Sequence, residues 1–397
     1  MISDIRKAYN ESFSSAKYEA FLNDISSRYD HRPPFRIAET PVFIGSDMRD
    51  KIVKACGEIC DVLCRDDFKD RSADALRPEY TVPNEPDHNV FLQLDFGLCE
   101  DGQGGLQPKL IELQGFPTLY YYQDLVANLY RKHFDIPDTV SHLFNNYNGA
   151  DYRALLRKII LGSSAPENCI LLEVEPHKQP TQIDFWATRE KLGLKVLCIS
   201  DLKKSGRDLY YEDDHGKKIG VDRIYNRVIF DELVGRKDLQ REYSFTDEVN
   251  VHWVGHPNWF FRISKNTLEL LNDSPYVPKT TRLSQLDEIP KDLENYVLKP
   301  LYSFSGSGVI FHVTQRHIEA IENPDNFILQ EKVCYSPVIK SPDGDVKCEV
   351  RMLMIWEPDQ ERPTLVNNLA RLSRGEMIGV KYNRDMTWVG GSVGFFE

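Results

Sequence analysis

The sequence has little of what would direct a chain to a membrane, a nucleic acid or an oxidising compartment. No run of about 18 apolar residues occurs, so no membrane span is expected. The first residues also lack the apolar segment of a signal peptide. Lys and Arg number 49 against 61 Asp and Glu, a formal net charge of −12, whereas nucleic acids and anionic membranes bind basic surfaces. We therefore expect a cytoplasmic protein with no nucleic-acid or membrane partner.

Metal-site patterns built on cysteine and histidine are also missing. The eight cysteines form no Cys-x-x-Cys pair. Cys56, Cys60 and Cys64 are four residues apart, on one face of an expected helix. This spacing fits a thiolate metal site, but without a nearby His it favours small core residues. His252 and His256 are also four apart, in a segment rich in Trp, Gly and Pro that favours a loop or domain seam over a helix.

The pattern changes several times along the 397 residues, a length that corresponds to two or three domains. We expect an N-terminal helical region (1–87), a β-hairpin followed by helices (88–164), a parallel α/β unit (165–262), and a region of mostly antiparallel strands with helices (263–397). The expected fold class therefore combines α/β and α+β architecture.

Local periodicity predicts the main elements. The expected helices span 51–64, 120–133, 181–192 with Gly193 as its C-cap, and 264–271. The expected strands include 90–96, 109–114, 168–174, 195–199, 296–300, 309–313, 327–333 and 348–356.

A lysine followed by a loop rich in Gly and Ser lies between two of these strands. Lys299 is near the end of the first strand, and the loop spans 303–308. Glycines let backbone N–H groups approach phosphate oxygens, serines add donors, and the lysine neutralises charge, so the segment suits a polyphosphate. It is not a Walker A loop, because the lysine precedes the glycines. A structural turn in a hairpin is the alternative interpretation.

The order of motifs around this loop resembles that of the ATP-grasp superfamily. A segment with Lys265 precedes Pro278-Lys279-Thr280, the Lys299-Pro300 strand end, the loop, and Ile328-Leu329-Gln330-Glu331. The resemblance implies that Lys265 and Lys299 bind ATP. It further implies that the phosphates are covered by Ser303, Ser305, Gly306, Ser307 and Gly308, and that the adenine hinge is Gln330, Glu331, Lys332 and Val333.

The magnesium ligands of most ATP-grasp proteins follow these motifs, but here the sequence ends soon after Gly391. Earlier in the chain, Leu94-Asp95-Phe96 with 110–114 resembles the D-F-H … L-I-E-I-N hairpin of circularly permuted ATP-grasp proteins of the glutathionylspermidine-synthetase type. The resemblance implies a circularly permuted ATP-grasp fold with a pre-ATP-grasp α/β domain, and Mg²⁺ held by Asp95, Glu112 and Gln114. Glu112 and Gln114 are two apart on a strand and project from one face. The family usually has Asn at 114 and often Arg at 93, where this chain has Gln.

Three arginines complete the set that the resemblance implies. Arg351 matches a D-x-R position, Arg371 the place of a second catalytic arginine, and Arg227 a Y-x-R segment at the cleft. Such groups stabilise charge that develops on a γ-phosphate or an oxyanion. For Arg351 and Arg371 the alternative is an ion pair with a surface carboxylate.

The resemblance implies an ATP-dependent carboxylate–amine (or thiol) ligase that works through an acylphosphate. Its cofactors would be ATP and Mg²⁺, and its substrates a small carboxylate and an amine or peptide. Gln93 and Gln114 leave open a non-catalytic nucleotide-binding protein with a degenerate site. A small-molecule kinase on the same fold is a further alternative.

Overall fold

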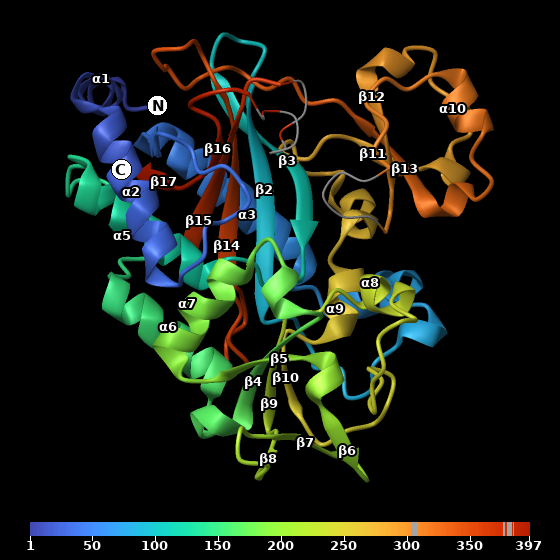
Figure 1. Ribbon diagram of the computed structural model, residues 1–397. Coiled ribbons are helices and arrows are strands. Elements are labelled where there is room, and N and C mark those ends of the chain that lie inside the picture. The colour runs from blue at the N-terminus through green and yellow to red at the C-terminus, as the bar shows by residue number, and fades with distance from the viewer. Residues whose placement is uncertain (303–307, 376–377, 379–382, 384) are drawn as a thin grey trace.

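The computed structural model describes residues 1–302, 308–375, 378, 383 and 385–397. A large sheet lies at the centre of the molecule (Figure 1), with a small antiparallel lobe at upper right and a parallel α/β unit below. None of the helices within the described residues has the length and apolar character needed to span a bilayer.

The α-helices are α1 (Ser3–Ser12), α2 (Ser15–Arg28), α3 (Ser46–Leu63), α4 (Phe68–Arg71), α5 (Tyr120–His133), α6 (Gly149–Leu161), α7 (Gln182–Leu192), α8 (Phe230–Gly235), α9 (Pro257–Arg262) and α10 (Gln315–Glu319). The strands are β1 (Val42–Ile44), β2 (Phe91–Glu100), β3 (Leu106–Gln114), β4 (Cys169–Glu173), β5 (Lys195–Cys198), β6 (Lys203–Ser205), β7 (Asp208–Glu212), β8 (Lys218–Gly220), β9 (Arg223–Asn226), β10 (His252–Val254), β11 (Thr280–Arg282), β12 (Tyr296–Pro300), β13 (Phe327–Glu331), β14 (Lys347–Ile355), β15 (Thr364–Ser373), β16 (Gly390–Ser392) and β17 (Gly394–Phe396).

The large sheet joins an early hairpin to late strands. Its order is β16-β15-β14-β2-β3, with antiparallel neighbours. The expected hairpin β2–β3 therefore forms, and β2 pairs along its length with β14, placing Asp95 opposite Arg351. Alternate residues point to opposite faces of a strand. Leu94, Val350 and Met352 lie on one face, in the same apolar core as α3, while Asp95 and Arg351 lie on the other.

The small lobe is the three-stranded sheet β11-β13-β12. Leu298 points into the lobe's own core, and its neighbour Lys299 projects from the opposite face. The expected strand over 309–313 does not form: Ile310 makes a single bridge to Leu298. The expected helix over 264–271 is a 3₁₀ helix, Lys265–Leu271, capped by the Ser264 side chain.

The parallel α/β unit forms as the sequence predicts. Its sheet has the order β10-β9-β4-β5, and all its pairs are parallel. Helix α7 ends at Gly193, whose φ of +76° suits a glycine C-cap. A separate antiparallel sheet, β6-β7-β8, lies beside this unit.

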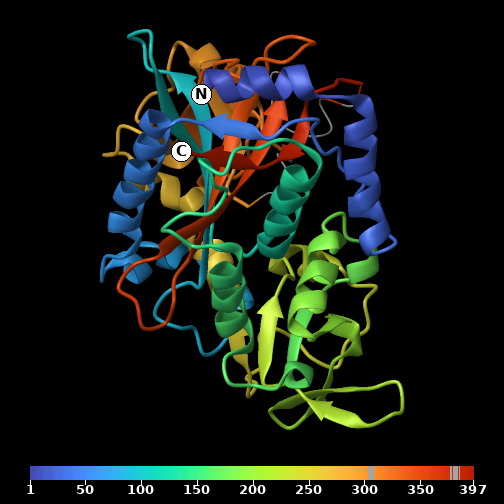
Figure 2. The ribbon, with the colours of Figure 1, turned by 90° about the vertical axis from the view of Figure 1, so that its left-hand side faces the viewer.

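The N-terminal region packs on the large sheet and shares its core. Figure 2 shows its helices beside the sheet and above the parallel unit. Cys56 and Cys60 on α3 are buried, in agreement with the core interpretation, and the Cys60 Sγ lies 3.9 Å from the Met354 Sδ. Strand β1, which the sequence analysis did not expect, pairs with β17, so segments near both termini are neighbours (Figure 1).

Candidate functional site

A cluster of charged side chains lies where the polar face of the large sheet meets the small lobe. The sheet contributes Gln93 and Asp95 from β2, Glu112 and Gln114 from β3, Glu349 and Arg351 from β14, and Arg371 from β15. Lys299 comes from β12 of the small lobe, and Lys265 comes from the 3₁₀ helix that precedes this lobe in the chain. Ion pairs connect the two arginines with Asp95, Glu112 and Glu349. The negative charge of Glu112 also acts on both lysines and opposes the lowering of their pKa values by burial. The structure thus brings together seven of the residues named from sequence, and the ion pair of Asp95 with Arg371 joins residues 276 positions apart.

Asp95 is the most enclosed carboxylate of the cluster. Arg351 binds it in a bidentate manner, with Nε–Oδ1 2.6 Å and Nη2–Oδ2 2.7 Å, and Arg371 also pairs with Oδ2. Burial alone would raise the pKa of Asp95, but the two guanidinium groups hold it below its usual value. Gln93, at the position where the family often has Arg, accepts a hydrogen bond from Arg351 at 3.0 Å.

Glu349 is a buried carboxylate that sequence analysis missed. It pairs with Arg371, and its Oε2 accepts a hydrogen bond of 3.0 Å from the Tyr335 hydroxyl. Burial raises the pKa of Glu349. A side chain at Gly97 would clash with Tyr335, because a Cβ there would lie 2.6 Å from the ring. A glycine inside strand β2 was therefore the available signal for a close neighbour at this point.

Lys299 links the small lobe to the edge strand of the large sheet. Its Nζ donates to the Gln330 Oε1 at 2.6 Å and to the Ile111 carbonyl at 3.2 Å. The pairing of β2 with β3 shifts at Asp95/Phe96 and leaves Ile111 without an opposite residue, which frees this carbonyl for the lysine. Burial lowers the pKa of Lys299 to about 8, partly opposed by Glu112.

Lys265 lies on the same side of the cluster. Burial lowers its pKa, while the charges of Glu112 and Asp231 oppose that shift. Together with Lys299, Arg351 and Arg371 it makes four cations, against the three carboxylates Asp95, Glu112 and Glu349. Their excess of positive charge suits a polyphosphate.

The expected adenine hinge connects the two lobes. Gln330 is buried; it accepts from Lys299 and donates to the Thr280 hydroxyl at 2.9 Å. The backbone N–H groups of Glu331 and Lys332 donate to the Lys279 and Asn295 carbonyls. Val333 follows β13, and the chain then returns to the large sheet, where Tyr335 bridges Cys99.

The loop that the resemblance assigns to the phosphates is described only at its end. Ser303, Ser305, Gly306 and Ser307 lie outside the described residues. Gly308 has a φ of +70°, and a Cβ there would lie 3.0 Å from Pro300.

The oxygen donors proposed for magnesium are not equally available. Glu112 and Gln114 lie on one face of β3, and the Gln114 amide donates to the Glu112 Oε1 at 3.0 Å. Both oxygens of Asp95 are bonded to arginines. No group of three or more His, Cys, Asp or Glu residues suited to a metal occurs among the residues that the structure describes. Glu112 and Gln114 fit a Mg²⁺ ion as oxygen donors, whereas Asp95 does not fit in this arrangement.

Arg227 does not join the cluster through the contacts described. It forms a buried ion pair with Asp184, Nη1–Oδ2 2.7 Å. The other oxygen of Asp184 accepts from the backbone N–H groups of Tyr121 and Tyr122 in the first turn of α5. The described contacts of Arg227 are therefore those of a buried ion pair that links the end of β9 to α7.

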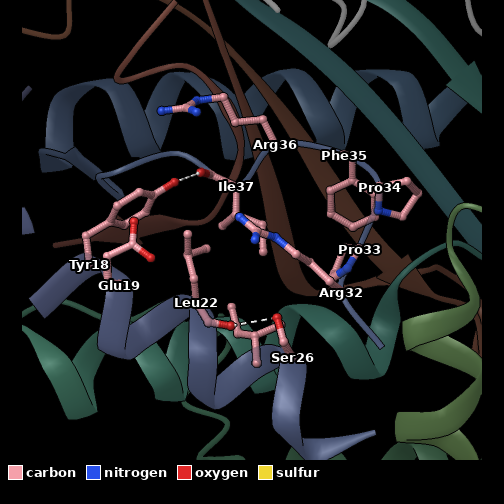
Figure 3. Close-up of a pocket in the computed structure, with 11 residues that line it drawn as sticks. Tyr18, Glu19, Leu22, Ser26, Arg32, Pro33, Pro34, Phe35, Arg36 and Ile37 are labelled. Atoms are coloured by element: carbon pink, nitrogen blue, oxygen red, sulfur yellow. Dashed lines mark hydrogen bonds between the residues drawn. The ribbon is translucent and has the colours of Figure 1, made fainter. Parts of the chain in front are cut away.

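Apart from the charge cluster, a cavity of about 310 Å³ lies between α2 and the 32–37 segment (Figure 3). Its wall includes the Tyr18 hydroxyl, which donates to the Ile37 carbonyl at 2.5 Å, and Arg36, which pairs with Glu39. None of the residues predicted for the ATP site lines it. Tyr18, Ser26 and Arg36 already bond to other parts of the fold, so the charge cluster is the better candidate.

Comparison with known proteins supports the fold. No protein-family model matches the chain, and no curated protein matches its sequence. Among solved structures, the chain is similar to a glutathione synthetase-like effector from Globodera pallida in its apo form, with a TM-score of 0.57 and 9% identity. The match covers 97% of this chain and 98% of that one. This likeness extends over nearly the whole molecule and concerns its mixed α/β architecture.

Proposed function

We propose that the protein is an ATP-dependent ligase with a circularly permuted ATP-grasp fold, which joins a small carboxylate to an amine or thiol. The observation that carries the proposal is the contact between Lys299 and the Ile111 carbonyl. Through this contact Lys299, the small-lobe lysine that the resemblance assigns to ATP, lies next to Glu112 on the β2–β3 hairpin. The hairpin also completes the sheet of late strands, as a permuted order of the same elements requires.

In this proposal ATP binds between the small lobe and the polar face of the large sheet. Its adenine lies near Gln330 to Val333, and its phosphates lie near Lys265 and Lys299. The excess of positive charge favours the polyphosphate, and Gln330 holds the Lys299 ammonium in place through a 2.6 Å hydrogen bond. Catalysis then depends on positioning and charge neutralisation.

The proposed reaction has two steps. A carboxylate oxygen of the first substrate attacks the γ-phosphorus, the bond to the bridging oxygen breaks, and ADP leaves. The amine or thiol then attacks the acyl carbon of the acylphosphate, loses its proton, and phosphate leaves. Arg371, half-buried beside Glu349, is placed to stabilise negative charge on the transferred group. Glu112 and Gln114 would hold Mg²⁺, which supplies charge neutralisation at the phosphates.

A non-catalytic nucleotide-binding protein is the second candidate, and Asp95 is the observation that favours it. In the proposed family an acidic residue at this position would ligate the metal, but here both oxygens are held by Arg351 and Arg371. A protein with this ion pair permanently closed would bind a nucleotide without turning it over.

The two candidates differ in the fate of ATP. The purified protein is incubated with Mg²⁺, ATP and pools of amino acids, peptides and polyamines, with hydroxylamine added to trap acylphosphates. A ligase forms ADP and phosphate in the presence of the correct carboxylate and yields a hydroxamate. A kinase forms ADP and a stable phosphorylated product without free phosphate. Binding of ATP by calorimetry with no ADP formed in any pool would contradict the ligase and support the binding protein.

A further inference from the structure

A cavity of about 320 Å³ lies below the small lobe, between the 75–80 segment, helices α8 and α9, and the ends of β12 and β13. This volume is at the small end of ligand pockets, which favours one compact molecule over an extended chain. The side chains that give the cavity its chemistry are Arg77, Tyr80, Asp231, Phe261, Tyr302 and Phe327.

Two opposite charges line this cavity, and neither forms an ion pair with another described residue. Asp231, in the first turn of α8, accepts a hydrogen bond from the backbone N–H of Glu232, and no basic side chain within the described residues pairs with it. Arg77 donates to the neutral amide of Asn326 at 3.2 Å, and it too has no carboxylate partner in the described part of the chain. Both are half-buried, and burial raises the pKa of Asp231. Partly buried charges are costly unless paired, so a ligand with both charges is complementary to this wall.

The rest of the wall is largely aromatic. Tyr80 stacks on Phe261 with ring centroids 5.9 Å apart, and Phe261 meets Tyr302 edge-on at 6.1 Å. The Arg77 guanidinium lies 5.3 Å from the centre of the Tyr302 ring. Rings of this kind present a large apolar surface to a ligand side chain.

The cavity also adjoins the proposed phosphate site. The charge of Asp231 acts on Lys265, which in turn feels Glu112. Pro300 and Tyr302, which line the cavity, directly follow Lys299 along the chain. A ligand amine held by Asp231 would therefore lie close to Lys265 and so to the proposed phosphate site.

We propose that this cavity binds the amine substrate, and that this substrate is a free α-amino acid with an apolar or aromatic side chain. Its ammonium pairs with Asp231, its carboxylate pairs with Arg77, and its side chain packs on the aromatic wall. The proposal rests on the ligase function for the fate of the amine: the ammonium first gives one proton to Asp231, the neutral amine then attacks the acyl carbon, and the phosphate leaves with the second proton.

The test is direct binding of L-phenylalanine, followed by calorimetry or saturation-transfer NMR, with and without Mg²⁺ and a non-hydrolysable ATP analogue. N-acetyl-L-phenylalanine lacks the ammonium charge, and L-phenylalanine methyl ester lacks the carboxylate charge. We expect each to bind about tenfold more weakly than the free amino acid, since each loses one charged contact.

Matched variants locate the two contacts. Asp231→Asn should abolish the preference over the N-acetyl compound, and Arg77→Gln the preference over the methyl ester. Glu232→Gln and Arg71→Gln are the controls, because they remove neighbouring charges that do not line the cavity. Both should keep the wild-type preferences.

Equal binding of the three compounds to the wild-type protein, or no binding of L-phenylalanine in either condition, would overturn the proposal even if a variant failed to fold. Failure of the ligase function is distinguishable. If ATP does not bind but the amino acid binds with these preferences, the proposed amino-acid site is supported and the proposed ligase function is contradicted. If ADP and hydroxamate form while the amino acid does not bind, only the cavity proposal fails.

Discussion

Arg351 and Asp95 join strands that are far apart in the sequence, through two parallel hydrogen bonds of 2.6 and 2.7 Å. The two residues are also opposite each other in the pairing of β14 with β2. Asp95 is 1% exposed, so water could not replace the hydrogen bonds that its carboxylate would lose with the arginine. This ion pair therefore stabilises the junction of hairpin and late strands, whatever else Asp95 does.

Asp95→Asn should lower the free energy of unfolding by about 3–5 kcal/mol, because breaking a buried pair leaves an uncompensated charge. Urea denaturation without added metal or nucleotide measures this effect. Asp61→Asn is the matched control: Asp61 also pairs with an arginine, Arg362, at 2.6 Å, but both side chains are more than half exposed. It should cost less than about 1 kcal/mol. Equal costs for the two variants would show that Asp95 is not a structural ion-pair partner.

Lys299→Met should weaken ATP binding by about 1.5–3 kcal/mol, since it removes a charged hydrogen-bond donor from the triphosphate. Methionine has a similar length and suits a buried site, so the variant should remain folded. Isothermal calorimetry gives the affinity. Lys340→Met is the control, because Lys340 pairs with the surface residue Asp345 outside the site. A folded Lys299→Met protein with wild-type affinity would remove this lysine from the nucleotide site.

Glu112→Gln should remove the part of ATP affinity that depends on Mg²⁺, because it neutralises the one carboxylate of β3, which Arg351 contacts at 3.5 Å and does not bind in a bidentate manner. Affinity measured in EDTA should not fall, since the variant removes a negative charge beside Lys265 and Lys299 and no group that contacts ATP without the metal. Glu100→Gln, on an exposed position of the same hairpin, should respond to Mg²⁺ as the wild type does. An unchanged Mg²⁺ effect in Glu112→Gln would place the metal elsewhere.

His256 should make stability depend on pH. Burial lowers its pKa from 6.5 to about 4. Its Nδ1 accepts from the Asn258 N–H, and its Nε2 lies 3.0 Å from the Pro83 carbonyl, an arrangement that needs the neutral ring. Between pH 6.5 and 4 the unfolded chain takes up a proton that the folded chain does not. The free energy of unfolding should therefore decrease as the pH is lowered through this window. The loss should reach about 3 kcal/mol at pH 4.

His256→Asn isolates that contribution, because asparagine keeps the capping acceptor at the start of α9 but does not titrate. The difference in unfolding free energy between wild type and variant should shrink or reverse on acidification. A difference that is constant from pH 7 to pH 4 would contradict the neutral, buried ring.

The sequence was most informative where the signal is local. Alternation around a Gly-rich turn predicted the hairpin, and strand–helix–strand spacing with Gly193 predicted the parallel unit. Lys265 and Lys299 were predicted because their motifs occur in a fixed order, and the structure brings both near Glu112. Local patterns failed at 309–313, where apolar residues with β propensity make only one bridge, since a strand also requires a neighbour of matching length.

The ion-pair partners of the charged residues could not be predicted from local sequence patterns. That Arg351 binds Asp95 depends on β14 pairing with β2 in a particular register, which neither segment specifies alone. Arg227 was predicted to face the cleft, but Asp184 on a different element pairs with it inside the protein. The roles of the site residues in binding ATP and Mg²⁺ stay predictions, to be tested by the variants above.

The same long-range pairing bears on how the chain folds during synthesis. Strand β2 ends at Glu100, and β14 begins at Lys347, so the hairpin leaves the ribosome long before its partner strand exists. Until then the backbone N–H and C=O groups along β2 form an open edge, the kind of surface on which chains aggregate. Contacts so distant in sequence also form slowly. We therefore expect the nascent chain, more than the finished protein, to depend on chaperones that shield a strand edge.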